Sequence, residues 1–238
     1  MVPVLLAIIP ALNEEETVAD VVRSVRDHLD ADVLVIDDGS RDRTTERASA
    51  AGAIVLRHPF NLGVGAALRT GFRYARANGY HAAVQVDADG QHEVTEAKRL
   101  ADVIDTGVDL VVGSRFEAGF ETSRLRRLSM RMLSRRISRY LGVTITDTTS
   151  GFRGFGPVAI ERFADAYPRA YLSDTVEALM VAGDWGLRVE EIPVRMLPRQ
   201  GGQPSAGTAK SMYHLVRLTL VIALHRFRRP LYVRGTDS

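Results

Sequence analysis

The sequence contains no cysteine, one tryptophan and few aromatic residues overall, and these shortages exclude several classes of protein. Without cysteine the chain has no disulfide, no thiolate metal site and no cysteine nucleophile, and it suits a reducing compartment. No apolar run reaches the length of about 18 residues that a membrane-spanning helix needs, so we expect none. We also expect no secretory signal peptide, because Met1 is followed almost at once by the strand-like segment 4–9.

The 238 residues are 45% hydrophobic, which supports one large globular domain with at most an appendage. The net charge is only +2, but basic residues gather in one block. Such a block suits nucleic acid, anionic lipid or a phosphate-bearing acceptor. It lacks the interleaved aromatic residues that stack on bases, so nucleic acid is not an expected partner. The arginines of this block are Arg124, Arg126, Arg127, Arg131, Arg135, Arg136 and Arg139.

In the first half of the chain, short apolar runs alternate with helical patterns. This rhythm predicts an α/β domain with a mostly parallel central sheet flanked by helices. Ligands of such sheets bind at the carboxyl ends of the strands, so polar segments that follow strands should meet at one edge. The predicted strands are 4–9, 32–37, 53–56, 82–87 and 109–112, and the predicted helices are 15–29, 42–51, 65–78 and 94–106.

After Gly113 the alternation breaks, and we expect a catalytic domain over residues 1–200 followed by an appendage over 201–238. The appendage should hold a mobile Gly/Pro/Ser-rich loop and an apolar helix, which packs in the core or lies at a membrane interface. Between these parts we predict a loop at 116–123, a basic amphipathic helix at 124–141, a short strand within 144–155, a helix at 173–182, and a bent strand or strand pair at 187–196.

An apolar strand ends in the carboxylates Asp87 and Asp89, and the amide Gln91 follows. Two carboxylates one residue apart, called here the DxD pair, suit a divalent cation such as Mg²⁺ or Mn²⁺ with a diphosphate. The alternative is a solvated turn before a helix. His92 is expected to be structural or solvated.

Two more polar segments follow strands. Residues 10–14 could line a nucleobase and ribose, or Asn13 could simply cap a helix with Glu16 at its third position. Asp37 and Asp38 could form a plain turn, but adjacent carboxylates repel each other unless partners such as a base or ribose are present. Gly63 opens a glycine-rich helix start that departs from a dinucleotide-binding pattern.

Arginines follow two of the motifs. Arg115 comes directly after the fifth predicted strand, and Arg153 ends the segment Ser150–Arg153. Each is either a surface residue or a fork that binds phosphate oxygens.

The ordered set of these motifs, over roughly residues 2–200, resembles the family 2 inverting glycosyltransferases of GT-A fold, a Rossmann-like nucleotide-diphospho-sugar transferase architecture. It is most similar to the polyprenyl-phosphate (dolichol-phosphate) mannosyl- and glucosyltransferases. The resemblance implies a UDP- or GDP-sugar donor, Mg²⁺ or Mn²⁺, and a polyprenyl-phosphate acceptor. It also implies a peripheral contact with the inner face of the cell membrane, from the cytoplasm.

The resemblance further implies roles for individual residues. The implied nucleotide-binding set is Pro10, Ala11, Leu12, Asn13, Glu14, Asp37, Asp38, Gly63, Asp87 and Ala88. The implied metal ligands are Asp87, Asp89 and Gln91, and the implied acceptor-phosphate set is Arg115, Arg153, Arg199 and Lys210. The expected catalytic residues are Asp89, Arg115, Arg153, Asp174 and Glu177.

The acceptor stays open between two classes. A phosphate acceptor is already an anion and needs no strong base, whereas a hydroxyl acceptor on a natural product or glycan would need one. Asp174 and Glu177 are the available carboxylates in the second half of the chain. A non-enzymatic module that binds membrane or nucleic acid through the basic block is a third hypothesis. The sequence leaves the nucleotide, the sugar and the oligomeric state open.

Overall fold

The computed structural model of the chain describes residues 5–115, 124–168 and 174–196, with only the backbone for 124–129. The predictions for the loop at 116–123, for Arg199, for Lys210 and for the C-terminal loop and helix lie outside these residues. The division into residues 1–200 and 201–238 therefore stays a prediction.

The described strands and helices alternate in the first half of the chain, as the sequence predicts. The strands are β1 (Leu5–Ala11), β2 (Asp32–Asp37), β3 (Ile54–Arg57), β4 (Ala82–Gln85), β5 (Leu110–Ser114), β6 (Arg153–Phe155) and β7 (Val189–Pro193). The helices are α1 (Val18–His28), α2 (Thr44–Ala50), α3 (Val64–Ala77), α4 (Val94–Ile104), α5 (Arg124–Leu141), α6 (Pro157–Ala166) and α7 (Asp174–Asp184).

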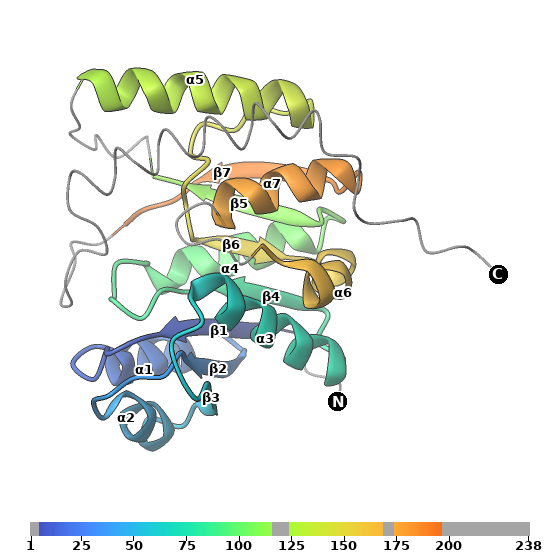
Figure 1. Cartoon of the computed structure of the whole chain (residues 1–238). Helices are drawn as coiled ribbons and strands as arrows, with labels where there is room; N and C mark the ends of the chain where they lie inside the picture. Colours follow the sequence, from blue (N-terminus) through green and yellow to red (C-terminus); the bar gives the residue numbers. More distant parts are fainter. Residues whose placement is uncertain (1–4, 116–123, 169–173, 197–238) are drawn as a thin grey trace. The chain divides into compact units, whose positions relative to one another are not determined.

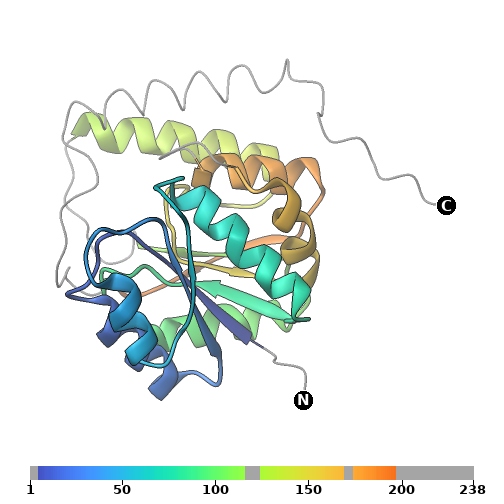
Figure 2. The same cartoon turned by 60° about the horizontal axis from the view of Figure 1, so that its bottom comes forward.

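All these strands form one seven-stranded sheet in the order β3-β2-β1-β4-β6-β5-β7. The neighbours are parallel except β6, which runs antiparallel to both β4 and β5. Helices cover both faces: α3, α6 and α7 lie in front of the sheet in Figure 1, and α1 and α4 lie behind it. Figure 2 shows the same two layers from another side. The prediction of a mostly parallel sheet between helices is confirmed.

The central strands β1, β4 and β5 are apolar because both of their faces are buried. On β4, Val84 packs into the core shared with α1 and α4, while its neighbour Gln85 points to the opposite face, the side of α3 and α6. That opposite face carries an aromatic cluster of Phe72, Phe155, Phe163 and Tyr167, with neighbouring ring centroids 4.7–6.0 Å apart. These contacts pack α3 and α6 against β6.

The first helix begins later than the sequence predicts, at Val18, and Asn13 does not cap it. Asn13 has a positive φ of 55°, which asparagine tolerates better than most residues, and its Oδ1 accepts a hydrogen bond from the backbone N–H of Arg41. The alternative that Asn13 caps this helix was therefore wrong. A tertiary contact with the loop after β2 uses the side-chain oxygen instead.

Two further elements differ from the sequence-based prediction. Helix α6 was not predicted, although Gly156 followed by Pro157 at the first helical turn is a common helix start. Within residues 187–196, where the sequence predicted a bent strand or a strand pair, Val189–Pro193 form a single strand, β7, and Met196 forms an isolated antiparallel bridge with His92. Pro193 ends that strand at the edge of the sheet, where a missing N–H does little harm.

Within the described residues, the helices all fall short of the length and apolarity that crossing a bilayer requires.

Candidate functional site

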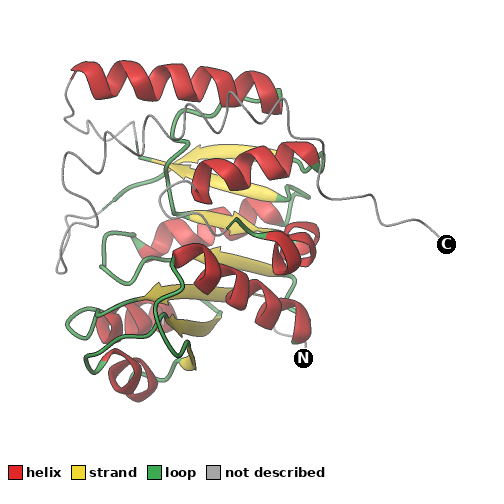
Figure 3. Cartoon of the chain, viewed as in Figure 1, coloured by secondary structure: helices red, strands yellow, loops and turns green. Residues whose placement is uncertain are grey.

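The polar segments named above meet at one edge of the sheet. The strands β1, β2 and β4 are parallel, so their carboxyl ends share this edge, and the loops that leave them gather on the left in Figure 3. Strand β5 ends at the same edge because it is antiparallel to β6, which is antiparallel to β4. The edge brings together most of the predicted site residues that the structure describes.

The loops after β1 and β2 are joined by hydrogen bonds. The backbone N–H of Asn13 donates to Ser40 Oγ at 2.9 Å, and the N–H of Glu14 donates to Thr44 Oγ1 at 2.9 Å. The N–H of Asp38 donates to the carbonyl of Ala11 at 2.9 Å. Residues 10–14 thus form a fixed wall of the edge, on which Leu12 and Asn13 are exposed.

Asp37 is fully buried and holds the turn that follows β2. It accepts hydrogen bonds from the Ser40 N–H at 2.8 Å and from the Thr45 hydroxyl, and Arg57 Nε lies 3.5 Å away. Burial raises the pKa of this carboxyl, but these hydrogen bonds and the charge of Arg57 outweigh burial and hold the pKa below its usual value. Asp37 is therefore ionised at neutral pH.

Asp38 holds the loop between β3 and α3. Its carboxylate accepts from the N–H of Leu62 at 2.9 Å and of Gly63 at 2.7 Å, and it lies 2.7 Å from His58 Nδ1. Gly63 has a φ of 91°, a conformation that suits glycine. Both carboxylates therefore have partners within the protein, which the plain-turn alternative did not supply. Any bond to a base or ribose would be made in addition to these.

The DxD pair lies on the turn after β4. The side chain of Asp87 is 40% exposed, and Asp89 is 7% exposed and accepts from the Gln91 N–H at 3.1 Å. Gln85 Nε2 donates to Asp87 Oδ1 at 3.2 Å. Gly151 faces this carboxylate, since a Cβ built there would lie 3.4 Å from Asp87 Oδ2. Asp87 is thus the accessible acid of the pair.

The carboxylate and amide oxygens of this turn suit a divalent cation whose coordination shell also includes substrate atoms. No cluster of three or more histidine or acidic side chains suited to a metal occurs in the part of the chain that the structure describes. Mg²⁺ is commonly bound by one or two carboxylates together with substrate phosphates, rather than by an all-protein cage. Asp87, Asp89 and the amide oxygen of Gln91 match that kind of site, and the missing side chain at Gly151 leaves room beside Asp87.

His92 belongs to the same turn and orients Asp87. Its Nδ1 accepts the backbone N–H of Asp87 at 2.9 Å, its Nε2 lies 3.5 Å from Asp87 Oδ2, and its ring stacks on Phe152 at 4.3 Å. Burial lowers the pKa of His92, although the charges of Asp87 and Asp89 oppose this. A neutral imidazole then places its remaining N–H toward Asp87. The short spacing to the DxD pair was the signal for this role.

Arg115 is held by an acid that sequence reasoning missed, Asp147. Arg115 Nε and Nη2 bind the two oxygens of Asp147 at 2.6 and 3.0 Å, and Nη2 also donates to Thr149 Oγ1 at 3.0 Å. Asp147 is fully buried, and burial raises its pKa less than the hydrogen bonds and charge of Arg115 lower it. Since the Arg115 side chain is 32% exposed, the guanidinium is both oriented and accessible.

Arg153, in contrast, is completely buried. Its Nε donates to the carbonyl of Ser150 at 2.9 Å and its Nη2 to that of Thr148 at 3.4 Å. Burial lowers the pKa of this guanidinium, while the nearby charges of Asp174 and Asp147 oppose that change. This burial argues against the predicted direct contact between Arg153 and an acceptor phosphate. Because side chains alternate between the two faces of a strand, the Arg153 side chain lies on the same face of the sheet as Gln85, its partner across the pairing of β4 with β6.

Asp174 begins α7 and is 4% exposed, whereas Glu177 is half-buried on the next turn. Burial raises the pKa of Asp174 to about 6, although Arg153 and the first backbone N–H groups of α7 oppose this, and Asp87 adds to it. Asp174 is therefore electrostatically coupled to Asp87 of the DxD pair.

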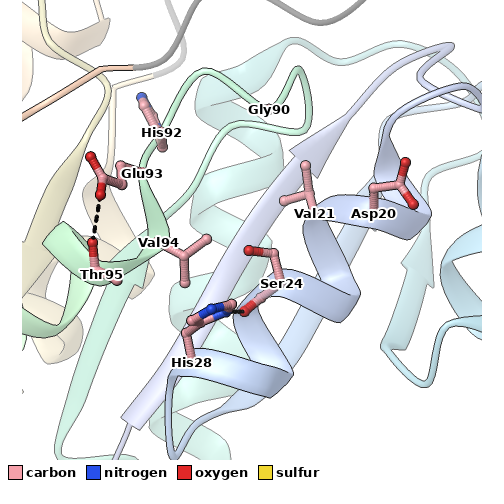
Figure 4. A pocket seen from close by; sticks show the side chains of 9 residues that line it. All are labelled: Asp20, Val21, Ser24, His28, Gly90, His92, Glu93, Val94 and Thr95. Carbon is pink, nitrogen blue, oxygen red and sulfur yellow. Dashed lines mark hydrogen bonds between the residues drawn. The ribbon is translucent and has the colours of Figure 1, made fainter.

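A groove of about 350 Å³ lies between α1 and the start of α4 (Figure 4). Its lining residues are Asp20, Val21, Ser24, His28, Gly90, His92, Glu93, Val94 and Thr95. Asp87, Asp89 and Arg115 are absent from that lining, but Gly90 and His92 of the DxD turn belong to it, so the groove adjoins the site at the sheet edge.

Comparisons with known proteins show which family the sequence matches. The model of the family described as glycosyl transferase family 2 matches residues 6–163. The chain is 32% identical over 208 residues to polyprenol monophosphomannose synthase of Mycolicibacterium smegmatis, covering 83% of this chain and 78% of that protein. It is 32% identical over 214 residues to undecaprenyl-phosphate mannosyltransferase of Micrococcus luteus, covering 83% and 85%.

A solved structure shares the fold. Glucosyl-3-phosphoglycerate synthase of Mycobacterium tuberculosis, crystallised with Mn²⁺, uridine diphosphate and phosphoglyceric acid, aligns with a TM-score of 0.72 over 96% of this chain and 80% of that chain. At 22% identity this likeness supports the GT-A architecture and nothing finer.

Proposed function

Because the chain belongs to glycosyl transferase family 2 and is a glycosyltransferase, we propose that it moves a hexose from a UDP- or GDP-sugar to a polyprenyl phosphate, with Mg²⁺ or Mn²⁺ as cofactor. The names of the two mannosyltransferases cited above support the acceptor class. The observation that carries the proposal is the meeting of the DxD pair and the Arg115–Asp147 pair at one edge of the sheet.

The proposed chemistry needs charge stabilisation more than proton transfer. A phosphate oxygen of the acceptor attacks the anomeric carbon as the bond from that carbon to the donor diphosphate breaks, so the configuration inverts. A divalent cation at Asp87 and Asp89 would supply positive charge to the leaving diphosphate. Arg115, anchored on Asp147, holds its free N–H donors toward phosphate oxygens without reorganising.

Helix α5 supports a contact with the membrane that holds such an acceptor. Four of its arginines are exposed, namely Arg131, Arg135, Arg136 and Arg139, and Met132 beside them is 65% exposed. A row of arginines around an apolar side chain suits an anionic lipid surface. Ile137 on the opposite side is buried and anchors the helix to the domain.

A hydroxyl acceptor is the second candidate, and Asp174 is the observation that favours it. A buried carboxyl with a pKa raised to about 6 is mostly ionised at neutral pH and still basic enough to accept a proton. In that case Asp174, rather than the charge of the acceptor, would activate the nucleophile.

The experiment that separates the candidates is transfer of a labelled hexose from UDP- and GDP-sugars to a short polyprenyl phosphate or to the matching polyprenol. We expect product from the phosphate and none from the alcohol. Transfer to the alcohol with equal efficiency would overturn the proposed acceptor class in favour of the second candidate.

A further inference from the structure

Four buried polar side chains adjoin the DxD turn, and we call them the polar cluster: Gln85, Arg153, Tyr167 and Asp174. Their exposed fractions are 3%, 0%, 2% and 4%. They come from β4, from β6, from the residue after α6 and from the start of α7. Arg153 feels the charge of Asp174, and Gln85 is hydrogen-bonded to Asp87, so the cluster connects α7 with the candidate metal turn.

Three atoms of the polar cluster lack hydrogen-bond partners among the described residues: Gln85 Oε1, Arg153 Nη1 and the Tyr167 hydroxyl. A buried polar atom without a partner costs about 1–3 kcal/mol, so native structures hold few of them. Two of the three, Gln85 Oε1 and Arg153 Nη1, belong to residues on adjacent strands, so one bridging group could satisfy both.

Gln85 and Arg153 are directly opposite each other in the antiparallel pairing of β4 with β6. Side chains at such positions share a face, with Cβ atoms about 4.5–5.5 Å apart. The carboxylate of Asp87 only accepts hydrogen bonds, so the Gln85 amide nitrogen must face it, and the amide oxygen is left over. A guanidinium only donates, so the spare atom of Arg153 is a donor beside a spare acceptor.

We infer that Gln85 and Arg153 are positioning residues that fix Asp87 for the cation and the donor diphosphate, linked to each other through one water molecule. The inference rests on the proposed function. The link runs from the buried guanidinium through the amide to Asp87 Oδ1. Gly151 allows it to be compact, because a Cβ there would lie 3.1 Å from Gln85 Nε2 and crowd the amide against Asp87.

The test measures Mn²⁺ and nucleotide binding by calorimetry, in wild-type protein and in Gln85→Met. Methionine keeps the length of the side chain but removes both the donor to Asp87 and the acceptor for Arg153. Loss of an outer partner of a metal ligand typically weakens metal affinity by about 10–100-fold, and we expect a loss in that range for Mn²⁺ in the presence of nucleoside diphosphate. Tyr167→Phe is the matched control, since it removes a third unpaired atom that does not bond Asp87, and its affinity should equal that of the wild type.

A double-mutant cycle with Arg153→Lys tests the link itself. If the two side chains act through one link, the double variant binds Mn²⁺ no more weakly than the weaker single variant. Should Gln85→Met not fold, Gln85→Asn gives the same test, because its shorter side chain cannot reach both partners. Unchanged Mn²⁺ affinity in a folded Gln85 variant would overturn the inference alone. A wild-type protein that binds no Mn²⁺ with any nucleotide would overturn the proposed function as well.

Discussion

At the scale of single residues, the site depends on side chains whose orientation is set by a second side chain. Arg115 uses Nε and Nη2 to bind Asp147, which is fully buried, and His92 uses one ring nitrogen to hold the backbone of Asp87. Such pairs keep donors and acceptors in place before a substrate arrives, which is the condition for strong electrostatic stabilisation of a transition state. Substitutions that keep charge but lose geometry should therefore be costly.

Arg115→Lys tests this at the phosphate contact. Lysine keeps the positive charge but cannot form the planar two-bond contact with Asp147. We expect kcat/KM for sugar transfer to fall about 100-fold, by analogy with the loss of one preorganised donor. Steady-state kinetics with both substrates measures the effect, and Asp147→Asn should lower kcat/KM in the same way. Full activity in Arg115→Lys would mean that charge alone is sufficient at this position.

Asp174 gives a prediction about stability and pH. Its folded-state pKa is raised to about 6, so the folded protein binds a proton that the unfolded chain has already released. This group's contribution to stability therefore falls as pH rises from the unfolded pKa of about 3.9 through the folded pKa. Relative to Asp174→Asn, the wild type should lose about 1 kcal/mol of unfolding free energy between pH 5 and pH 8.

Urea denaturation of both proteins at several pH values measures that difference. The subtraction cancels groups common to both proteins, including Asp37 and Asp147. Because the pKa values of these two carboxyls are lowered, their contribution to stability is lost only at acidic pH. Parallel stability curves for the two proteins would show that Asp174 is not shifted as described.

At the scale of elements, α5 links an exposed surface rich in arginine to the loop that carries Asp147. The Ser134 and Ser138 hydroxyls donate to the carbonyl of Ile145, and Glu191 of β7 accepts from the N–H groups of Thr146 and Asp147. The loop that supplies Asp147 to Arg115 is thus held between α5 and the last strand. A helix that meets a lipid surface on one side would place the acceptor phosphate close to this loop.

Replacing Arg135 and Arg136 together with Gln tests the membrane contact. Each arginine near an anionic surface contributes about 1 kcal/mol, so vesicle binding should weaken about 30-fold. Sedimentation with vesicles that contain anionic lipid measures this. The matched control, Arg23→Gln with Arg47→Gln, removes two exposed arginines from α1 and α2 and should bind as the wild type does. Equal losses in both variants would indicate a general charge effect without a docking face.

At the scale of the whole molecule, the sequence predicts what local patterns determine. The strands at 4–9, 32–37 and 82–87 and the acidic turns after them follow from apolar periodicity and from the residue types at strand ends. The insertion of β6 between β4 and β5 could not be predicted, because the sequence of three residues does not determine which strands they pair with. The same holds for Asp147, because its bond to Arg115 joins positions 32 residues apart. The burial of Arg153 could not be predicted either, because burial depends on contacts between distant elements and not on the local sequence motif.

We propose that the DxD pair and Arg115 serve metal-dependent sugar transfer to a lipid phosphate. The most direct measurement is the transfer of labelled hexose from a nucleotide sugar to a short polyprenyl phosphate, with Mn²⁺ and with chelator. We expect lipid-linked product with Mn²⁺, from one nucleotide in preference to the other, and none with chelator. Product formed equally well in chelator, or no product from any UDP- or GDP-sugar with folded protein and Mn²⁺, would contradict it.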